Sequence, residues 1–191
     1  MKKIPIEISA RHIHLCQKDL EKLFGRGFKL KKLKDLSQPG EFASSQTVEL
    51  IGPKSSYKKI RVVGPVRKNT QAEITVTDCR ILGIDAPVRI SGELKKSAGA
   101  VIVGPKGKVK LISGVIVAQR HLHLSLIDAK ELKLKNGQTV SVKTIGNRSV
   151  TFHHIIVRTG ENYKTACHLD TDEGNAAGMK TCGYGMLMAK N

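Results

Sequence analysis

The chain has 191 residues, of which 40% are hydrophobic, enough for one large domain or for two small domains with separate cores. Lysine and arginine number 33 against 16 acidic residues, and the resulting net charge of +17 favours an anionic partner. The sequence contains no run of eighteen apolar residues and no apolar segment typical of a signal peptide, so we expect a cytoplasmic protein with no membrane partner. Only 4% of the residues are aromatic and none is Trp, which leaves few rings on which nucleic acid could stack, so a phosphorylated small molecule fits the charge as well as nucleic acid does.

The first predicted strand, residues 4–10, leads into the pentapeptide Arg-His-Ile-His-Leu at residues 11–15. The pattern recurs as Arg-His-Leu-His-Leu at residues 120–124, after an apolar run at residues 115–118. Side chains two residues apart on a strand point the same way, so each pentapeptide presents two imidazoles on one face. Histidine is the commonest metal ligand and its neutral form suits zinc. The alternative is an internal duplication whose histidines only pack against a neighbouring strand.

Each pentapeptide is followed by the pattern of a short helix, at residues 16–24 and 125–132. The first helix leads into a basic stretch, residues 25–36, which ends at a turn-forming Ser-Gln-Pro-Gly sequence. This stretch is either an ordinary solvated surface or a rim that faces the phosphates of a substrate. The lysines that would form such a rim are Lys29, Lys31, Lys32 and Lys34.

Beyond residue 46 the chain reads as short strands separated by Gly and Pro, which is typical of a small barrel or a sandwich. The second half repeats this plan, because residues 138–142 resemble residues 46–50 and residues 153–158 resemble residues 58–62. The sequence therefore predicts a mostly β fold of two small pseudo-equivalent β-barrels with short capping helices. We expect one domain at 16–113, with an insertion at about 24–40, and a second domain formed by 1–15 plus 114–191.

The same alignment brings Glu73 of the first repeat to the place of His168 in the second. Both residue types bind zinc, and three protein ligands with an open fourth position are typical of a catalytic zinc. Two candidate ligand sets result, which are His12, His14 and Glu73 in one repeat and His121, His123 and His168 in the other.

Six segments together resemble the PduL-type phosphotransacylases, the phosphate propanoyltransferases of bacterial microcompartments. They are the two pentapeptides, Ser-Gln-Pro-Gly-Glu-Phe-Ala at 37–43, Gly-Pro-Val-Arg at 64–67, Thr-Gln-Ala-Glu-Ile at 70–74 and His-Leu-Asp-Thr-Asp-Glu at 168–173. They cover nearly the whole chain in the family's order. This chain departs from the family at Cys16, where Ser is usual, and at Gly174, where Ala is usual.

The resemblance implies paired β-barrels with two zinc ions per chain near their junction, bound by the two ligand sets. It implies a phosphate acyltransferase that converts short-chain acyl-coenzyme A and phosphate reversibly to acyl phosphate and coenzyme A by direct transfer. Arg67 matches the family's phosphate-binding arginine. A kinase that uses acyl phosphate is the implied pathway partner, and association of identical chains is compatible with it. The first strand begins close to Met1, so we expect no N-terminal targeting extension of the family's type, and microcompartment association by another route stays open.

A second reading stays open at this point. A duplicated β-barrel could instead bind nucleic acid or another polyanion, with structural zinc or with none. Metal content separates the two readings, because the enzyme should hold close to two zinc ions per chain.

Overall fold

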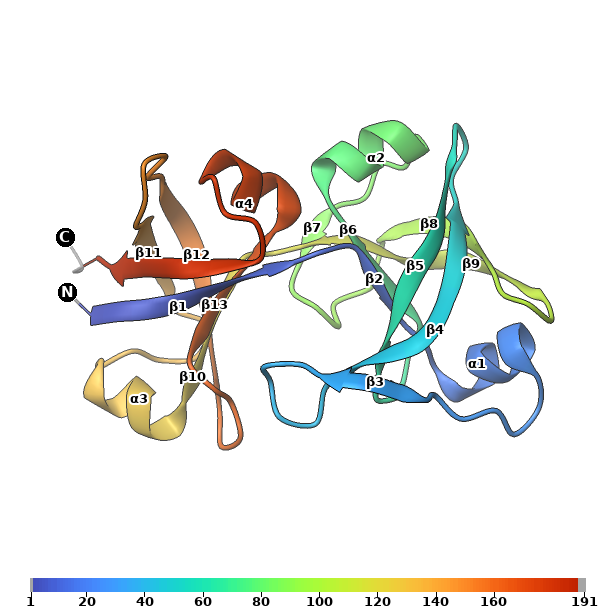
Figure 1. The fold of residues 1–191 in the computed structure, drawn as a ribbon, viewed down its shortest axis with the longest axis horizontal. Helices are drawn as coiled ribbons and strands as arrows, with labels where there is room; N and C mark the ends of the chain where they lie inside the picture. The colour runs from blue at the N-terminus through green and yellow to red at the C-terminus, as the bar shows by residue number, and fades with distance from the viewer. Residues whose placement is uncertain (1, 189–191) are drawn as a thin grey trace. The chain divides into compact units, whose positions relative to one another are not determined.

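The computed structural model describes residues 2–188, which form strands and four short helices (Figure 1). No helix in this range is long and apolar enough to cross a membrane. The chain divides into two compact units, one made of Met1–Ala10 with Gln119–Asn191 and the other of Arg11–Ala118.

The first unit is a closed barrel of six strands. Around the barrel the order is β1 (Lys2–Ser9), β13 (Ala166–Asp170), β10 (His121–Ser125), β12 (Thr151–Gly160), β11 (Thr139–Thr144) and β14 (Cys182–Leu187).

The second unit also closes into a ring of six strands, because β8 pairs with both β9 and β4. The order is β4 (Phe42–Ile51), β5 (Ser56–Gly64), β2 (His12–His14), β6 (Gln71–Ile74), β9 (Lys108–Ala118) and β8 (Ala98–Val103). Two further strands, β3 (Lys32–Asp35) and β7 (Val88–Arg89), pair with β4 and β9. The expected pair of small β-barrels is therefore confirmed.

The two barrels match strand by strand. In each, the strand with the histidine pair runs parallel to one neighbour, β5 or β12, and antiparallel to the other, β6 or β13. Lys59 and His154, which the sequence aligns, both adopt a left-handed backbone, with φ of 58° and 56°. This agreement supports the internal duplication.

Each histidine pair forms a short strand of its own, whereas the sequence placed it at the end of the preceding strand. The chain leaves regular structure at residues 10–11 and 119–120. The preceding strands, β1 and β9, belong to the opposite units. The short strand β2 finds both of its hydrogen-bonding partners, β5 and β6, within the second unit. The chain therefore passes from one unit to the other after residues 10 and 118. The domain boundaries expected from the sequence lie after residues 15 and 113.

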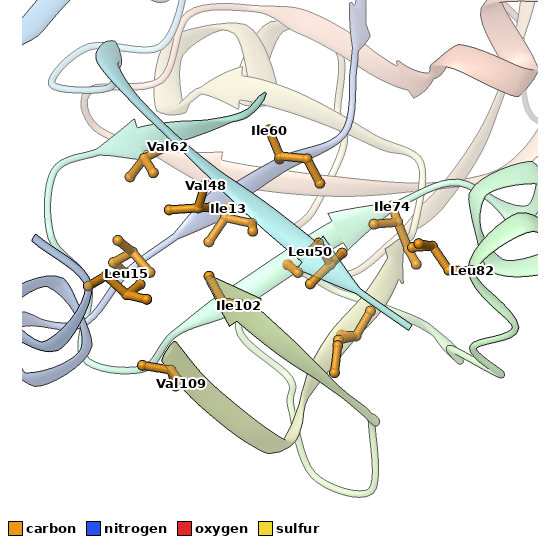
Figure 2. Close-up of a cluster of buried hydrophobic side chains, with 14 of the residues drawn as sticks. Ile13, Leu15, Val48, Leu50, Ile60, Val62, Ile74, Leu82, Ile102 and Val109 are labelled. Atoms are coloured by element: carbon orange, nitrogen blue, oxygen red, sulfur yellow. The ribbon is translucent and has the colours of Figure 1, made fainter. Parts of the chain in front are cut away.

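Apolar side chains from alternate strand positions fill each barrel. In the second unit the ring strands and α2 surround a cluster that includes Ile13, Leu50 and Ile102, each fully buried (Figure 2). In the first unit Ile4, Ile6 and Leu122 belong to the corresponding cluster. Burial of this many branched side chains, each worth about 1.5–3 kcal/mol, holds the short strands in register.

Four helices cap the strands. Two agree with the sequence, α1 (Gln17–Phe24) after Cys16 and α3 (Leu126–Glu131) after Ser125. The other two, α2 (Val76–Leu82) and α4 (Thr171–Ala176), were not predicted. Residues 73–76 alternate polar and apolar side chains, which predicts a strand, but this prediction is wrong beyond Ile74. A capping box begins each of these helices, in which the side chains of Thr75 and Asp78, or of Asp170 and Glu173, bind each other's backbone N–H groups.

Candidate active site

The first candidate ligand set comes together between β2 and β6. His12 lies directly opposite Glu73 in this antiparallel pair, and His14 lies two residues along on the same face. The Nε2 atoms of His12 and His14 are 3.2 Å apart. The Glu73 carboxylate oxygens lie 3.7 Å from His12 Nε2 and 4.0 Å from His14 Nε2. Ligand atoms of a tetrahedral zinc site with bonds near 2.1 Å are about 3.4 Å apart, so the two nitrogens and the Glu73 carboxylate lie close to the required spacing.

The surroundings of this set lower the pKa values of His14 and Glu73, which favours the binding of a cation. His14 Nδ1 lies 3.2 Å from the Val63 carbonyl, which can only accept, so Nδ1 carries the hydrogen and Nε2 keeps its lone pair. Burial, with the charges of His12 and Arg67, lowers the pKa of His14 to about 3. Burial alone would raise the pKa of Glu73, but His12, His14, the Ser91 hydroxyl and Arg67 lower it to about 2. At neutral pH the set therefore offers an unprotonated imidazole and a carboxylate.

A hydrogen-bonded network joins Arg67 to this set. Ser91 Oγ donates to Glu73 Oε1 at 2.8 Å and accepts from Arg67 Nη1 at 3.2 Å. Gln71 Nε2 donates to both Glu73 and Ser91. The second arm of the guanidinium, Nη2, contacts Glu41 Oε1 at 2.9 Å, and the Arg67 side chain is 31% exposed. Arg67 is thus held beside the first set and remains open to solvent.

The second candidate set comes together in the same way between β10 and β13. His121 lies directly opposite His168, with ring centroids 5.0 Å apart, and His123 lies 4.7 Å and 4.9 Å from these two rings. One ligand atom from each residue lies within 4.8 Å of the other two. His121 Nδ1 lies 2.9 Å from the Gln119 carbonyl, which again leaves the Nε2 lone pair for a metal ion.

The buried His123 side chain of this set lacks hydrogen-bond partners in the described part of the chain. Among residues 2–188 neither ring nitrogen of its buried side chain has a hydrogen-bond partner. Burial, followed by the charges of His121 and His168, lowers the pKa of His123 to about 2, so the ring is neutral at pH 7. The Tyr163 ring stacks on the same imidazole at 4.2 Å. An unpaired buried nitrogen costs about 1–3 kcal/mol, and a bound cation would remove that cost.

Other predicted residues remain apart from the two sets. Lys29, Lys31, Lys32 and Lys34 are exposed, and Lys32 pairs with Asp35 at 2.9 Å. Cys16 belongs to neither candidate metal group found in the described part of the chain. The residues that sequence reasoning missed are Glu41, Gln71, Ser91 and Tyr163. Gln71 could have been found, since it lies two residues before Glu73 on a strand, whereas Ser91 follows β7 and carries no local signal.

A family model described as phosphate propanoyltransferase matches residues 5–180 of the chain. The chain belongs to the phosphate propanoyltransferase family. It is 47% identical to the phosphate propanoyltransferase of Salmonella typhimurium strain LT2, over 92% of this chain and 83% of the relative. It is 43% identical to that of Clostridioides difficile strain 630, over 95% and 84% of the two chains. Membership of this phosphate propanoyltransferase family makes the chain a phosphotransacylase and decides against the reading as a polyanion-binding module.

Proposed function

We propose that the chain transfers a propanoyl or similarly short acyl group reversibly between coenzyme A and inorganic phosphate by direct attack on the thioester. A phosphate oxygen bonds to the carbonyl carbon and the carbon–sulfur bond breaks. The sulfur keeps the electron pair and takes up the proton of hydrogen phosphate. A kinase that uses acyl phosphate would consume the product.

The observation that carries this proposal is the link from Arg67 through Ser91 to Glu73. A guanidinium donates charge-assisted hydrogen bonds to phosphate, and Arg67 has one arm on Ser91 and the other on Glu41. Phosphate would take the place of the Glu41 carboxylate on Nη2. Ser91 would keep the guanidinium at a fixed distance from Glu73, so the bound phosphate would lie beside the first ligand set.

We further propose that both sets hold zinc. His12, His14 and Glu73 would bind one ion, and His121, His123 and His168 would bind the other. The spacing of the first set and the unpaired nitrogens of His123 support this fit. When bound, zinc at these sites would stabilise the coenzyme A thiolate and polarise the phosphate or carbonyl oxygen. The chain's own residues supply neutral imidazoles and a carboxylate in fixed positions.

Direct transfer needs no protein nucleophile, and two features of the chain agree with it. The sequence contains no Gly-x-Ser-x-Gly motif that would supply an acyl-enzyme. Burial raises the pKa of the Cys167 thiol to about 12, which makes this side chain a poor nucleophile at neutral pH. Phosphate and the thioester would therefore be bound together.

Coenzyme A carries a 3′-phosphate and a diphosphate, which need cationic contacts. We propose that Lys29, Lys31, Lys32 and Lys34 attract these groups from solvent. All four side chains are exposed on the segment that precedes and forms β3, and that segment leads to the turn with Glu41, the partner of Arg67. Their role is recruitment rather than chemistry.

The test is an assay of acetyl-, propanoyl- and butanoyl-coenzyme A with phosphate, following released thiol and acyl phosphate separately. We expect thiol release that depends on phosphate, with one acyl phosphate formed per thiol. Activity should be lost on treatment with a chelator and return with zinc. Thiol release without acyl phosphate would indicate a thioesterase and contradict the proposal.

A further inference from the structure

The arginine before the first histidine pair makes an unusually complete contact. Arg11 Nε lies 3.0 Å from both carboxylate oxygens of Asp78, and Nη2 lies 2.7 Å from Oδ1. The Asp78 side chain is 0% exposed. The guanidinium also lies over the Tyr57 ring, 4.2 Å from its centroid. Arg11 is therefore fixed by a buried charge and by an aromatic face.

The arginine before the second histidine pair repeats this arrangement. Arg120 Nε lies 2.7 Å from Glu173 Oε1, and the guanidinium lies 5.3 Å from the Phe152 centroid. The sequence alignment of the repeats makes Phe152 the counterpart of Tyr57, since both precede the aligned pairs at 58–59 and 153–154. The residue types differ between the repeats, but each arginine contacts one acidic side chain and lies over one aromatic ring.

Both carboxylates hold the same position next to the third ligand. Glu73 lies near the end of β6, and the helix that follows begins with a capping box in which Asp78 binds the Thr75 N–H. His168 lies in β13, and the next capping box has Glu173 bound to the Asp170 N–H. In each repeat the third ligand is two residues before the capping residue. Each carboxylate thus ties the end of the third-ligand strand to the arginine that directly precedes the histidine pair.

We propose that Arg11 and Arg120 are positioning residues that hold the third ligand of each metal set against its histidine pair. This inference rests on the proposed metal sites. The strands concerned have three to five residues, so few backbone hydrogen bonds fix them. Metal ligands must be held within about 0.5 Å for tight binding, and loss of such supporting contacts typically weakens metal affinity by 10–100-fold.

The experiment measures zinc affinity at one site at a time by competition with a chromophoric chelator. Arg120→Gln is placed in a His12→Ala, His14→Ala background, which leaves only the second set, and also in a His121→Ala, His123→Ala background, which leaves only the first. We expect zinc binding to weaken at least about tenfold in the first background and to stay unchanged in the second. Lys135→Gln is the control, because it removes one exposed positive charge from the same unit.

Conservative variants separate positioning from folding. Glu173→Gln keeps a residue suited to the capping box but removes the charge, so it should weaken the second site as Arg120→Gln does. Arg120→Lys should restore part of the affinity. For the first site, Arg11→Gln with Asp78→Asn leaves no buried unpaired charge and should weaken only that site.

Two outcomes would overturn the inference. One is a lower melting temperature of the metal-depleted variant with unchanged zinc affinity, which would make the pair a general stabiliser of the fold. The other is an equal loss of affinity at both sites. The two background proteins are first measured with Arg11 and Arg120 intact. If neither of them binds zinc, the proposed metal sites are contradicted, and this result is distinct from a failure of the inference about the arginines.

Discussion

His121 lies directly opposite His168 across the antiparallel strands β10 and β13, with the two ring centroids 5.0 Å apart. The pairing of β2 and β6 sets His12 opposite Glu73 in the same way. Backbone hydrogen bonds therefore bring the third residue of each set to its histidine pair, and each set lies wholly within one unit. Loss of one set should leave the other intact.

Replacement of His121 and His123 by Ala should lower zinc content by about one equivalent per chain. The two substitutions remove two of three ligands from the second set and leave His12, His14 and Glu73 unchanged. The measurement is metal analysis of purified protein after dialysis. The matched control is His153→Ala with His154→Ala, two histidines of the same barrel that belong to neither set. Full zinc retention in the first variant would contradict the ligand assignment.

The sequence alone identified the two candidate sets, because the duplication repeats their pattern. Two His-x-His motifs and the alignment of Glu73 with His168 depend on local spacing, which the chain displays directly. The pairing of β2 with β5 and β6 depends on residues 49 to 61 positions away in the sequence. The break between β1 and β2 could therefore not be predicted from local patterns. Ser91 likewise reaches Glu73 from 18 residues away.

The helices show a second limit of local patterns. Glu73 to Val76 alternates polar and apolar residues as a strand would, yet the strand ends at Ile74 and α2 begins at Val76. Thr75 and Asp78 form a capping box whose carboxylate is buried against Arg11, and that tertiary contact favours the helix. Helix α3, with Ser125 as an unambiguous cap, was predicted correctly.

Arg67→Lys should weaken the use of phosphate. Lysine keeps the positive charge but cannot contact Ser91 and an anion through two arms of one planar group. We expect KM for phosphate to rise about tenfold, the equivalent of one lost charge-assisted hydrogen bond, with KM for acyl-coenzyme A nearly unchanged. Arg61→Lys is the control, since Arg61 contacts backbone carbonyls of Ser44 and Ser45 in the same unit. Unchanged phosphate kinetics would exclude Arg67 from phosphate binding.

Asp78→Asn should destabilise the fold in a pH-dependent way. Burial alone would raise the pKa of Asp78, but hydrogen bonds from Arg11 and from the Thr75 backbone hold it below its usual value of 3.8. A carboxyl whose pKa is lower in the folded state contributes stability above its unfolded pKa and loses it as pH falls through the folded pKa. The variant should lose about 2 kcal/mol in free energy of unfolding at pH 7, and the difference should narrow below about pH 4.

Urea denaturation of the metal-depleted protein between pH 7 and pH 3 checks this prediction. Metal depletion is needed because acid also releases cations from histidine. Asp35→Asn is the control, because Asp35 is 74% exposed and its pair with Lys32 is a surface salt bridge of small value. A difference that stays constant at every pH would mean that the negative charge of Asp78 does not stabilise the fold.

Replacement of Lys29, Lys31, Lys32 and Lys34 by Gln should raise KM for acyl-coenzyme A more than KM for phosphate. Coenzyme A carries several negative charges, so long-range attraction adds to its association rate, and this attraction is screened over about 10 Å at 0.1 M salt. Wild-type KM for acyl-coenzyme A should therefore rise with salt, and the variant should respond less. The control removes four exposed lysines elsewhere in the same unit, Lys18, Lys106, Lys108 and Lys110. Equal salt dependence in the two variants would mean that net charge, and not this segment, recruits the substrate.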